Sequence, residues 1–248
     1  MGSSLARREA VGRRLGLCPA HARTLARLGS PDGIQRFVTA LPMNFAIGRS
    51  AMSVAATLDA NRAHCLESSF VAAVALWMIG MPPLLVDLGA EEGDVDHVIA
   101  VFRRGRHWGA ISKSNTPYLR FRDPVYRSLR ELALSYFPQY VRFRRKTLRT
   151  YSVPVDMRRH DPALWVTHDR FSHEIIDVLT AARHYPLLPR ALSFALRPID
   201  PIESRATRIK EWEPPAARRS SLPDRAPAAA RSSRSRRIAA AAPARAAG

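Results

Sequence analysis

Apolar residues recur every three or four positions through the first quarter of the chain, which is the spacing of one face of an α-helix. This pattern predicts three short helices, over residues 19–29, 30–42 and 50–58. Pro19 and the pair Ser30-Pro31 mark two of the starts, because proline fits the first turn of a helix and serine can cap it.

The middle of the chain combines one long apolar helix with several strands. Residues 65–77 are largely apolar and predict a helix that is buried on most sides. A short apolar run at residues 83–88 predicts a strand, and residues 97–103 and 108–112 predict a hairpin. We expect the long helix to pack on an antiparallel sheet that contains the hairpin, which is an α+β fold.

The chain beyond the hairpin mixes both kinds of pattern. Helical spacing favours helices over residues 125–136 and 171–183, with an extended segment near residues 148–155. No internal repeat is visible.

The composition predicts one folded domain with a tail. The chain has 248 residues, of which 46% are hydrophobic. We expect a flexible N-terminus over residues 1–18, an α+β domain over residues 19–213 and a disordered tail over residues 214–248. The tail consists mainly of arginine, alanine, proline and serine, so it cannot bury enough apolar surface to offset the entropy of ordering.

The net charge of +18 comes almost entirely from arginine, since only Lys113, Lys146 and Lys210 are lysines. Residues 214–248 hold eight arginines and one aspartate, which gives this tail a charge of +7. Such a tail can contact a polyanion by counterion release. The rest of the chain lacks interleaved aromatic and basic residues, which argues against nucleic-acid binding as the main function.

The sequence predicts no membrane span and no secretory signal. No run approaches the roughly 20 apolar residues of a spanning helix, and the first twenty residues are polar and rich in arginine. Cys18 and Cys65 alone form no disulfide framework. The cytoplasm is therefore the expected compartment.

Cys65 is the leading candidate for chemistry. It stands at the predicted start of the long helix, where exposed N–H groups and the helix dipole favour a thiolate. We therefore expect its pKa to lie below the usual value of about 8.5. His97 opens a predicted strand and can take up the thiol proton, which is the pairing that cysteine acyl transfer requires.

Four short segments together resemble the transglutaminase-like superfamily, whose fold is papain-like and α+β. They are Cys65 to Trp77, Val86-Asp87-Leu88, Asp96-His97 and Trp108-Gly109-Ala110-Ile111. The resemblance extends over residues 30–125, and Asp123 to Ala133 is similar to an uncharacterised bacterial branch of these proteins. It implies that Cys65 is the nucleophile and His97 the general base. The family places an acid a few residues after the strand tryptophan, where this chain has Ser112.

The residue that orients His97 stays open. If residues 104 and 105 form a two-residue turn, opposed residues have numbers that sum to 209, and His97 faces Ser112. Serine can accept a hydrogen bond but supplies no charge. Asn115 offers a stronger acceptor, and we favour it narrowly as the orienting residue. Asp87 and Asp96 are further alternatives.

Two functions follow as hypotheses. The first is a cysteine hydrolase or acyl transferase that acts on an amide or a thioester. The second is a non-catalytic binding or maturation module that retains the fold, which the missing acid and the basic tail favour. The expected partner is in both cases a peptide or protein. A metal site at His64, Cys65 and His97 lacks a fourth ligand, so we expect neither metal nor cofactor.

Overall fold

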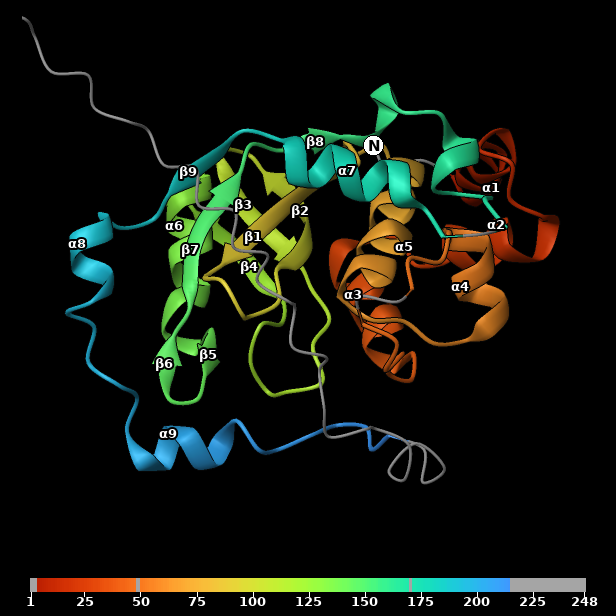
Figure 1. The fold of residues 1–248 in the computed structure, drawn as a ribbon. Coiled ribbons are helices and arrows are strands. Elements are labelled where there is room, and N and C mark those ends of the chain that lie inside the picture. Colours follow the sequence, from red (N-terminus) through yellow and green to blue (C-terminus); the bar gives the residue numbers. More distant parts are fainter. Residues whose placement is uncertain (1–3, 48–49, 170, 215–248) are drawn as a thin grey trace, which may run out of the picture. The chain divides into compact units, whose positions relative to one another are not determined.

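Seven strands form one antiparallel sheet within residues 4–47, 50–169 and 171–214, which the computed structural model describes. Their order is β4-β3-β2-β1-β7-β9, and β8 also pairs with β1 (Figure 1). The strands are β1 (Leu84–Ala90), β2 (His97–Arg104), β3 (His107–Ile111), β4 (Arg122–Tyr126), β7 (Leu148–Ser152), β8 (Val155–Asp156) and β9 (His184–Pro186). A separate hairpin comprises β5 (Val141–Arg142) and β6 (Arg145–Lys146).

Among the described residues, one group of helices precedes the sheet in the chain, and a second group lies between its later strands or follows them. The first group is α1 (Leu5–Arg14), α2 (Pro19–Ala26), α3 (Pro31–Ala40), α4 (Val54–Ala60) and α5 (Cys65–Met78). The second group is α6 (Leu129–Tyr136), α7 (His173–Ala181), α8 (Arg190–Ser193) and α9 (Pro201–Ala206). Short 3₁₀ turns occur at Phe137–Gln139, Met157–Arg159 and Pro162–Leu164.

Helix α5 lies at the centre of this arrangement, between the other N-terminal helices and the sheet (Figure 1). Twelve of its 14 residues are buried, so it lacks the polar, solvent-facing side that a surface helix has. Alanines at three positions allow neighbouring elements to approach closely: α1 to α4 contact the helix, and so do β1 and β2. The N-terminus of α5, where Cys65 stands, is thereby fixed relative to the sheet.

The sheet separates two hydrophobic cores, because successive residues of a strand face opposite sides. On the α5 side the strands contribute Leu85, Val98 and Ala100, and α7 adds Ile175 and Leu179. On the other side Val86, Leu88 and Ile99 pack against α6 through Leu132 and Tyr136. The α+β prediction is confirmed, including the long helix packed on an antiparallel sheet.

The expectation of a flexible segment over residues 1–18 is wrong for its described part. Residues 5–14 form helix α1, which packs against α2 and α5. Gly12 makes the contact possible, since a Cβ there would lie 3.1 Å from the Cβ of Ala22. Leu15 and Leu17 are buried just beyond the helix. The abundant arginines hid this packing from the sequence pattern because they occupy exposed positions of the same helix.

Two predicted helices begin later than expected, and each starts at a serine cap. The helix predicted from residue 50 begins at Val54, where the Ser53 side chain accepts a hydrogen bond from Ala56 N. The helix predicted over residues 125–136 begins at Leu129, where Ser128 accepts from Glu131 N. Residues 125 and 126, predicted as helix, instead end strand β4 (Arg122–Tyr126).

The β2–β3 hairpin forms as predicted, but with another register. Observed partners such as Ala100 and Ile111, or Arg104 and His107, have numbers that sum to 211. The turn therefore consists of residues 105 and 106, and Gly105 has a φ of +59°, which suits glycine. A shift of two residues leaves every side chain on its predicted face. Ser112 consequently still lies on the face that carries His97.

No helix among the described residues has both the length and the apolar character needed to cross a membrane. The tail predicted to be disordered, residues 214–248, lies outside the described residues apart from Pro214.

Candidate active site

Cys65 is the first residue of α5, and a turn held by backbone pairing places it there. Asn61 ends α4 with a φ of +46°, and Ala63 then pairs with the segment around Met43. His64 adopts an extended conformation and is the N-cap of α5. These features reverse the chain within four residues, so that the thiol meets the sheet at the beginning of strand β2.

A buried carboxylate supports this helix start. Glu67 is fully buried and accepts hydrogen bonds from the backbone N–H of His64 and from the side-chain amide of Asn44, each at 3.0 Å. It also accepts from Ser50 Oγ and from Met52 N. A buried carboxylate is tolerated when several donors surround it. Glu67 therefore ties residues 44–52, where described, to the first turn of the Cys65 helix.

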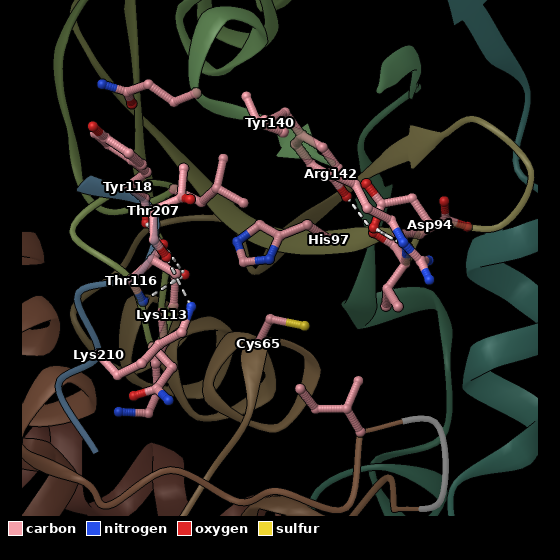
Figure 2. A pocket seen from close by; sticks show the side chains of 18 of the residues that line it. Cys65, Asp94, His97, Lys113, Thr116, Tyr118, Tyr140, Arg142, Thr207 and Lys210 are labelled. Atoms are coloured by element: carbon pink, nitrogen blue, oxygen red, sulfur yellow. Dashed lines mark hydrogen bonds and ion pairs between the residues drawn. The ribbon is translucent and has the colours of Figure 1, made fainter. Parts of the chain in front are cut away.

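His97 begins strand β2 and lines the same cavity as Cys65, a hollow of about 460 Å³. Ser69 of α5 donates to the carbonyl of Val98 at 2.9 Å, which fixes the helix to the strand that carries the imidazole. Figure 2 shows the His97 ring between two walls of this cavity. Lys113, Thr116, Tyr118 and Thr207 lie on one side, and Asp94 and Arg142 lie on the other.

Ser112 determines which nitrogen of His97 carries the proton. The Ser112 hydroxyl lies 2.7 Å from His97 Nε2 and 2.6 Å from the carbonyl oxygen of Leu119. A hydroxyl has one hydrogen, and the carbonyl can only accept, so Ser112 donates to Leu119 and accepts from His97. Nε2 of a neutral His97 is therefore protonated, and Nδ1 carries the lone pair. Among the described residues, no group donates to that nitrogen.

Gln35 of helix α3 holds Ser112 in position. Its side-chain amide accepts from Ser112 N at 3.0 Å and donates to Ser112 O at 2.9 Å. The backbone of Ser112 is thus paired on both sides by a residue 77 positions earlier. No local pattern marks Gln35, because its role depends on a contact between distant segments.

The thiol and the imidazole are both neutral in this environment. Burial raises the pKa of Cys65 to about 11, and the backbone N–H groups of Val98 and Leu66 oppose this rise only in part. Burial, followed by the charge of His64, lowers the pKa of His97 to about 4. The expected low pKa of Cys65 is therefore wrong, because desolvation at this site outweighs the N–H groups of the helix start.

No hydrogen bond joins Cys65 and His97 in the part of the chain that the structure describes. In Figure 2 the sulfur is turned away from the ring nitrogens, towards the side of Asp94 and Arg142. The arrangement brings a thiol and a base into one cavity without an ion pair between them. A rotation of the thiol about its Cα–Cβ bond would be needed before proton transfer.

The structure does not place Asn115 on His97. Its side chain donates to Trp212 O at 2.9 Å and accepts from Trp212 N at 2.8 Å. Glu211 N also donates to Asn115 O, and Glu211 pairs with Arg120. Asn115 lines the cavity but anchors the segment after α9 against the loop that follows Ser112. The hydrogen bond to His97 that we favoured for Asn115 is therefore made by Ser112.

The two alternative carboxylates also have other partners. Asp96 accepts from Ala90 N at 2.8 Å. Asp87 lies on the α5 side of β1, and one of its oxygens is 3.3 Å from His184 Nε2. Its other oxygen, Oδ1, is buried and has no hydrogen-bond partner among the described residues. Burial, with a further contribution from Asp96, raises the pKa of Asp87 to about 6. Within the described residues, neither carboxylate forms a hydrogen bond or ion pair with the His97 ring.

Lys113 is a buried cation in the wall of the cavity. Its ammonium group donates to the carbonyl oxygens of Leu41 at 2.6 Å and Thr39 at 3.3 Å, at the end of helix α3. Burial lowers its pKa to about 8. Carbonyl oxygens at a helix C-terminus favour a positive charge, so this lysine has a structural role.

No cluster of three or more metal-binding side chains occurs among the described residues. His64, one of the considered ligands, is buried and bonds through Nε2 to the carbonyl of Ser50 at 2.8 Å. The cavity therefore brings the Cys65 thiol and the His97 imidazole together among other polar and charged side chains.

No protein-family model matches the chain, and no curated protein has a matching sequence. What the protein does must therefore be inferred from the site itself. The sequence pattern found Cys65, His97 and Ser112; it missed Gln35 and the pair formed by Asp87 and His184. Those contacts join segments that are far apart in the chain.

Proposed function

We propose that the protein is a cysteine hydrolase or acyl transferase that acts on an amide or a thioester through Cys65 and His97. One observation carries the proposal: a thiol at a helix N-terminus and an imidazole with an unprotonated Nδ1 line the same cavity. His97 is buried and Cys65 is half-buried at the cavity, which argues against an accidental surface pair. The order of helix cysteine and strand histidine also supports a transglutaminase-like, papain-like fold, although Ser112, just after the next strand, stands where the family has an acid.

The reaction would proceed through an acyl enzyme. The Cys65 sulfur attacks the carbonyl carbon while its proton moves to His97 Nδ1, and the resulting oxyanion is met by backbone N–H groups at the start of α5. His97 then returns the proton to the leaving nitrogen or sulfur as the bond to carbon breaks. Water or an amine releases the acyl group from Cys65. Atoms and charge balance without a cofactor.

Proton transfer must be coupled to attack in this site. Burial raises the pKa of the Cys65 thiol to about 11 and lowers that of the His97 imidazole to about 4, so each group favours its neutral form before substrate binds. The proton moves as the sulfur–carbon bond forms, or after substrate has changed the surroundings of both groups.

Mass spectrometry with a peptide thioester tests the proposal. The wild-type protein should gain one acyl group on Cys65 and release it to water or to an added amine. Cys65→Ala should lower turnover more than about 1,000-fold, as the loss of a nucleophile does in related chemistry. Cys18→Ala is the matched control, because Cys18 is exposed and outside the cavity. Equal turnover by wild-type and Cys65→Ala protein would refute the proposal.

The second candidate function is a non-catalytic module that binds a peptide or protein. The raised pKa of Cys65 and the neutral hydroxyl on His97 favour it, since neither activates the thiol. In this case peptides would bind in the cavity with the same affinity in wild-type and Cys65→Ala protein. No acyl adduct would form with either thioesters or amides.

A further inference from the structure

The turn between β5 and β6 is strained, and it stands at the cavity of Cys65 and His97. Strand pairs Val141–Lys146 and Arg142–Arg145 leave Phe143 and Arg144 as a two-residue turn. Their φ angles are +48° and +67°, a conformation that normally selects asparagine or glycine. A left-handed conformation of a bulky residue costs on the order of 1 kcal/mol or more, so two in succession require outside support.

Contacts from another segment supply that support. Ile199 N donates to the carbonyl of Arg144 at 3.0 Å, and the Arg144 guanidinium donates to Ile199 O at 3.1 Å. The guanidinium of Arg142 lies over the Phe143 ring at 5.1 Å. The turn is therefore held by Ile199 through Arg144, although its own sequence disfavours the conformation.

The strained turn carries an exposed aromatic ring at the cavity. Phe143 is 85% exposed and lines the cavity that holds Cys65 and His97. Ile47 and Val95, from two other loops, are 42% and 56% exposed and line it too. A single exposed apolar side chain is ordinary, but three around one cavity form a patch that suits an apolar ligand group.

We propose that Phe143 is a specificity-determining residue that binds an apolar side chain next to the reacting carbonyl of a peptide substrate. The inference rests on the proposed acyl-transfer function and names its substrate class. Backbone strain is retained at functional sites when it positions a group that the relaxed chain would not present. Here the strained turn presents a ring whose burial against a substrate side chain would contribute binding free energy.

The remaining lining distinguishes a peptide from a fatty acyl chain. Asp94, Asp96, Thr116 and Gln139 place polar groups around the same cavity. An extended peptide can add hydrogen bonds to such groups through its amides, whereas a hydrocarbon chain would remove these polar and charged groups from water and offer them no hydrogen bond in return. The mixture of three apolar side chains and several polar ones therefore fits a peptide with one apolar side chain near the reacting bond.

Covalent labelling of Cys65 tests this substrate class without a natural substrate. Two acetylated peptide chloromethyl ketones are compared, one with leucine and one with glycine at the residue that carries the reactive group. In wild-type protein the leucine probe should label Cys65 at least about tenfold faster, the range expected when an apolar side chain gains a pocket. Phe143→Ala should reduce the leucine rate nearly to the glycine rate and leave the glycine rate unchanged.

Three variants make the result specific. Phe194→Ala removes another exposed phenylalanine that does not line the cavity, and should change neither rate. Phe143→Leu keeps an apolar side chain and should restore most of the leucine preference. Phe143→Gly should raise Tm, because glycine relieves the positive φ, while it abolishes the preference. A lower Tm for Phe143→Gly would contradict a turn strained for binding.

The outcomes separate the two proposals. If wild-type protein labels Cys65 equally fast with both probes, the role of Phe143 is refuted and the acyl-transfer site stands. If neither probe labels Cys65, the proposed function fails, and the substrate class fails with it. If Phe143→Ala slows both probes equally, the residue supports the structure of the cavity and does not select the side chain.

Discussion

Two histidines on the same sheet are held in opposite ways. His97 on β2 donates to a neutral hydroxyl, that of Ser112, and lies in a cavity beside a thiol. His184 on β9 contacts a carboxylate, that of Asp87, which does not line that cavity. His184 therefore has the charged partner but, among the described residues, no thiol beside it. His97 has the thiol beside it but a partner without charge.

The difference shows how an imidazole can be oriented without being charged. A carboxylate would favour the protonated ring of His97 and raise its pKa. Ser112 instead fixes the tautomer and leaves the pKa of the ring at about 4, as its burial dictates. Such a site keeps a base that is unprotonated at neutral pH, but it offers little driving force for removing a proton from the thiol.

The largest expected effect comes from replacing each histidine in turn. His97→Asn should lower kcat for acyl transfer by about 10² to 10⁴, the usual contribution of general acid–base catalysis. His184→Asn should keep kcat within about threefold, because His184 is outside the cavity. Turnover of a peptide thioester by purified variants gives both numbers. A larger loss in His184→Asn than in His97→Asn would reverse the assignment of the two sites.

The free energy of unfolding should reveal the buried pair of Asp87 and His184 through its dependence on pH. The pKa of Asp87 is about 6 in the folded protein against 3.8 for the unperturbed group, so the folded state holds its proton more tightly. Stability is therefore lost as pH rises from about 4 through 6. The side chain of Asp87→Asn cannot titrate. As pH rises across this window, the free energy of unfolding of the variant should therefore increase relative to that of wild type by up to about 3 kcal/mol.

Urea unfolding at pH 4, 5 and 7 measures this change. Asp177→Asn on helix α7 replaces an exposed carboxyl group and is the control. Asp87→Asn also weakens the hydrogen bond to His184, which shifts the difference at every pH but does not by itself give it this slope. A difference between Asp87→Asn and wild type that is independent of pH would show that the buried carboxyl has no raised pKa.

The sequence could predict those features that depend on local patterns. Local patterns predicted the Cys65 helix, the strand at His97 and the hairpin, because apolar spacing and turn residues act over a few positions. The shift of two residues in the hairpin did not matter for Ser112, since faces repeat with that period. The α+β architecture and the shared cavity of Cys65 and His97 followed from these elements.

Features that depend on distant contacts could not be predicted. The pKa of Cys65 was expected to be low from its place at a helix start, but burial among residues of other segments decides it. Asn115 was favoured for its chemistry, yet Trp212 takes up its amide almost a hundred positions later in the chain. The positive φ of Phe143 was equally invisible, because the turn that contains it is held through Arg144 by Ile199, far along the chain.

The smallest effect concerns the residue that orients His97. Ser112→Ala removes the acceptor for Nε2–H, so the ring can adopt the other tautomer, whose Nδ1 cannot accept the thiol proton. Loss of one such hydrogen bond should lower kcat about tenfold, with KM nearly unchanged.

Asn115→Ala should act mainly on KM, because it releases the segment at Trp212 that borders the cavity. Nitrogen NMR of the His97 ring reports the tautomer directly. If Asn115→Ala lowers kcat more than Ser112→Ala and alters the ring signals, Asn115 and not Ser112 orients the base.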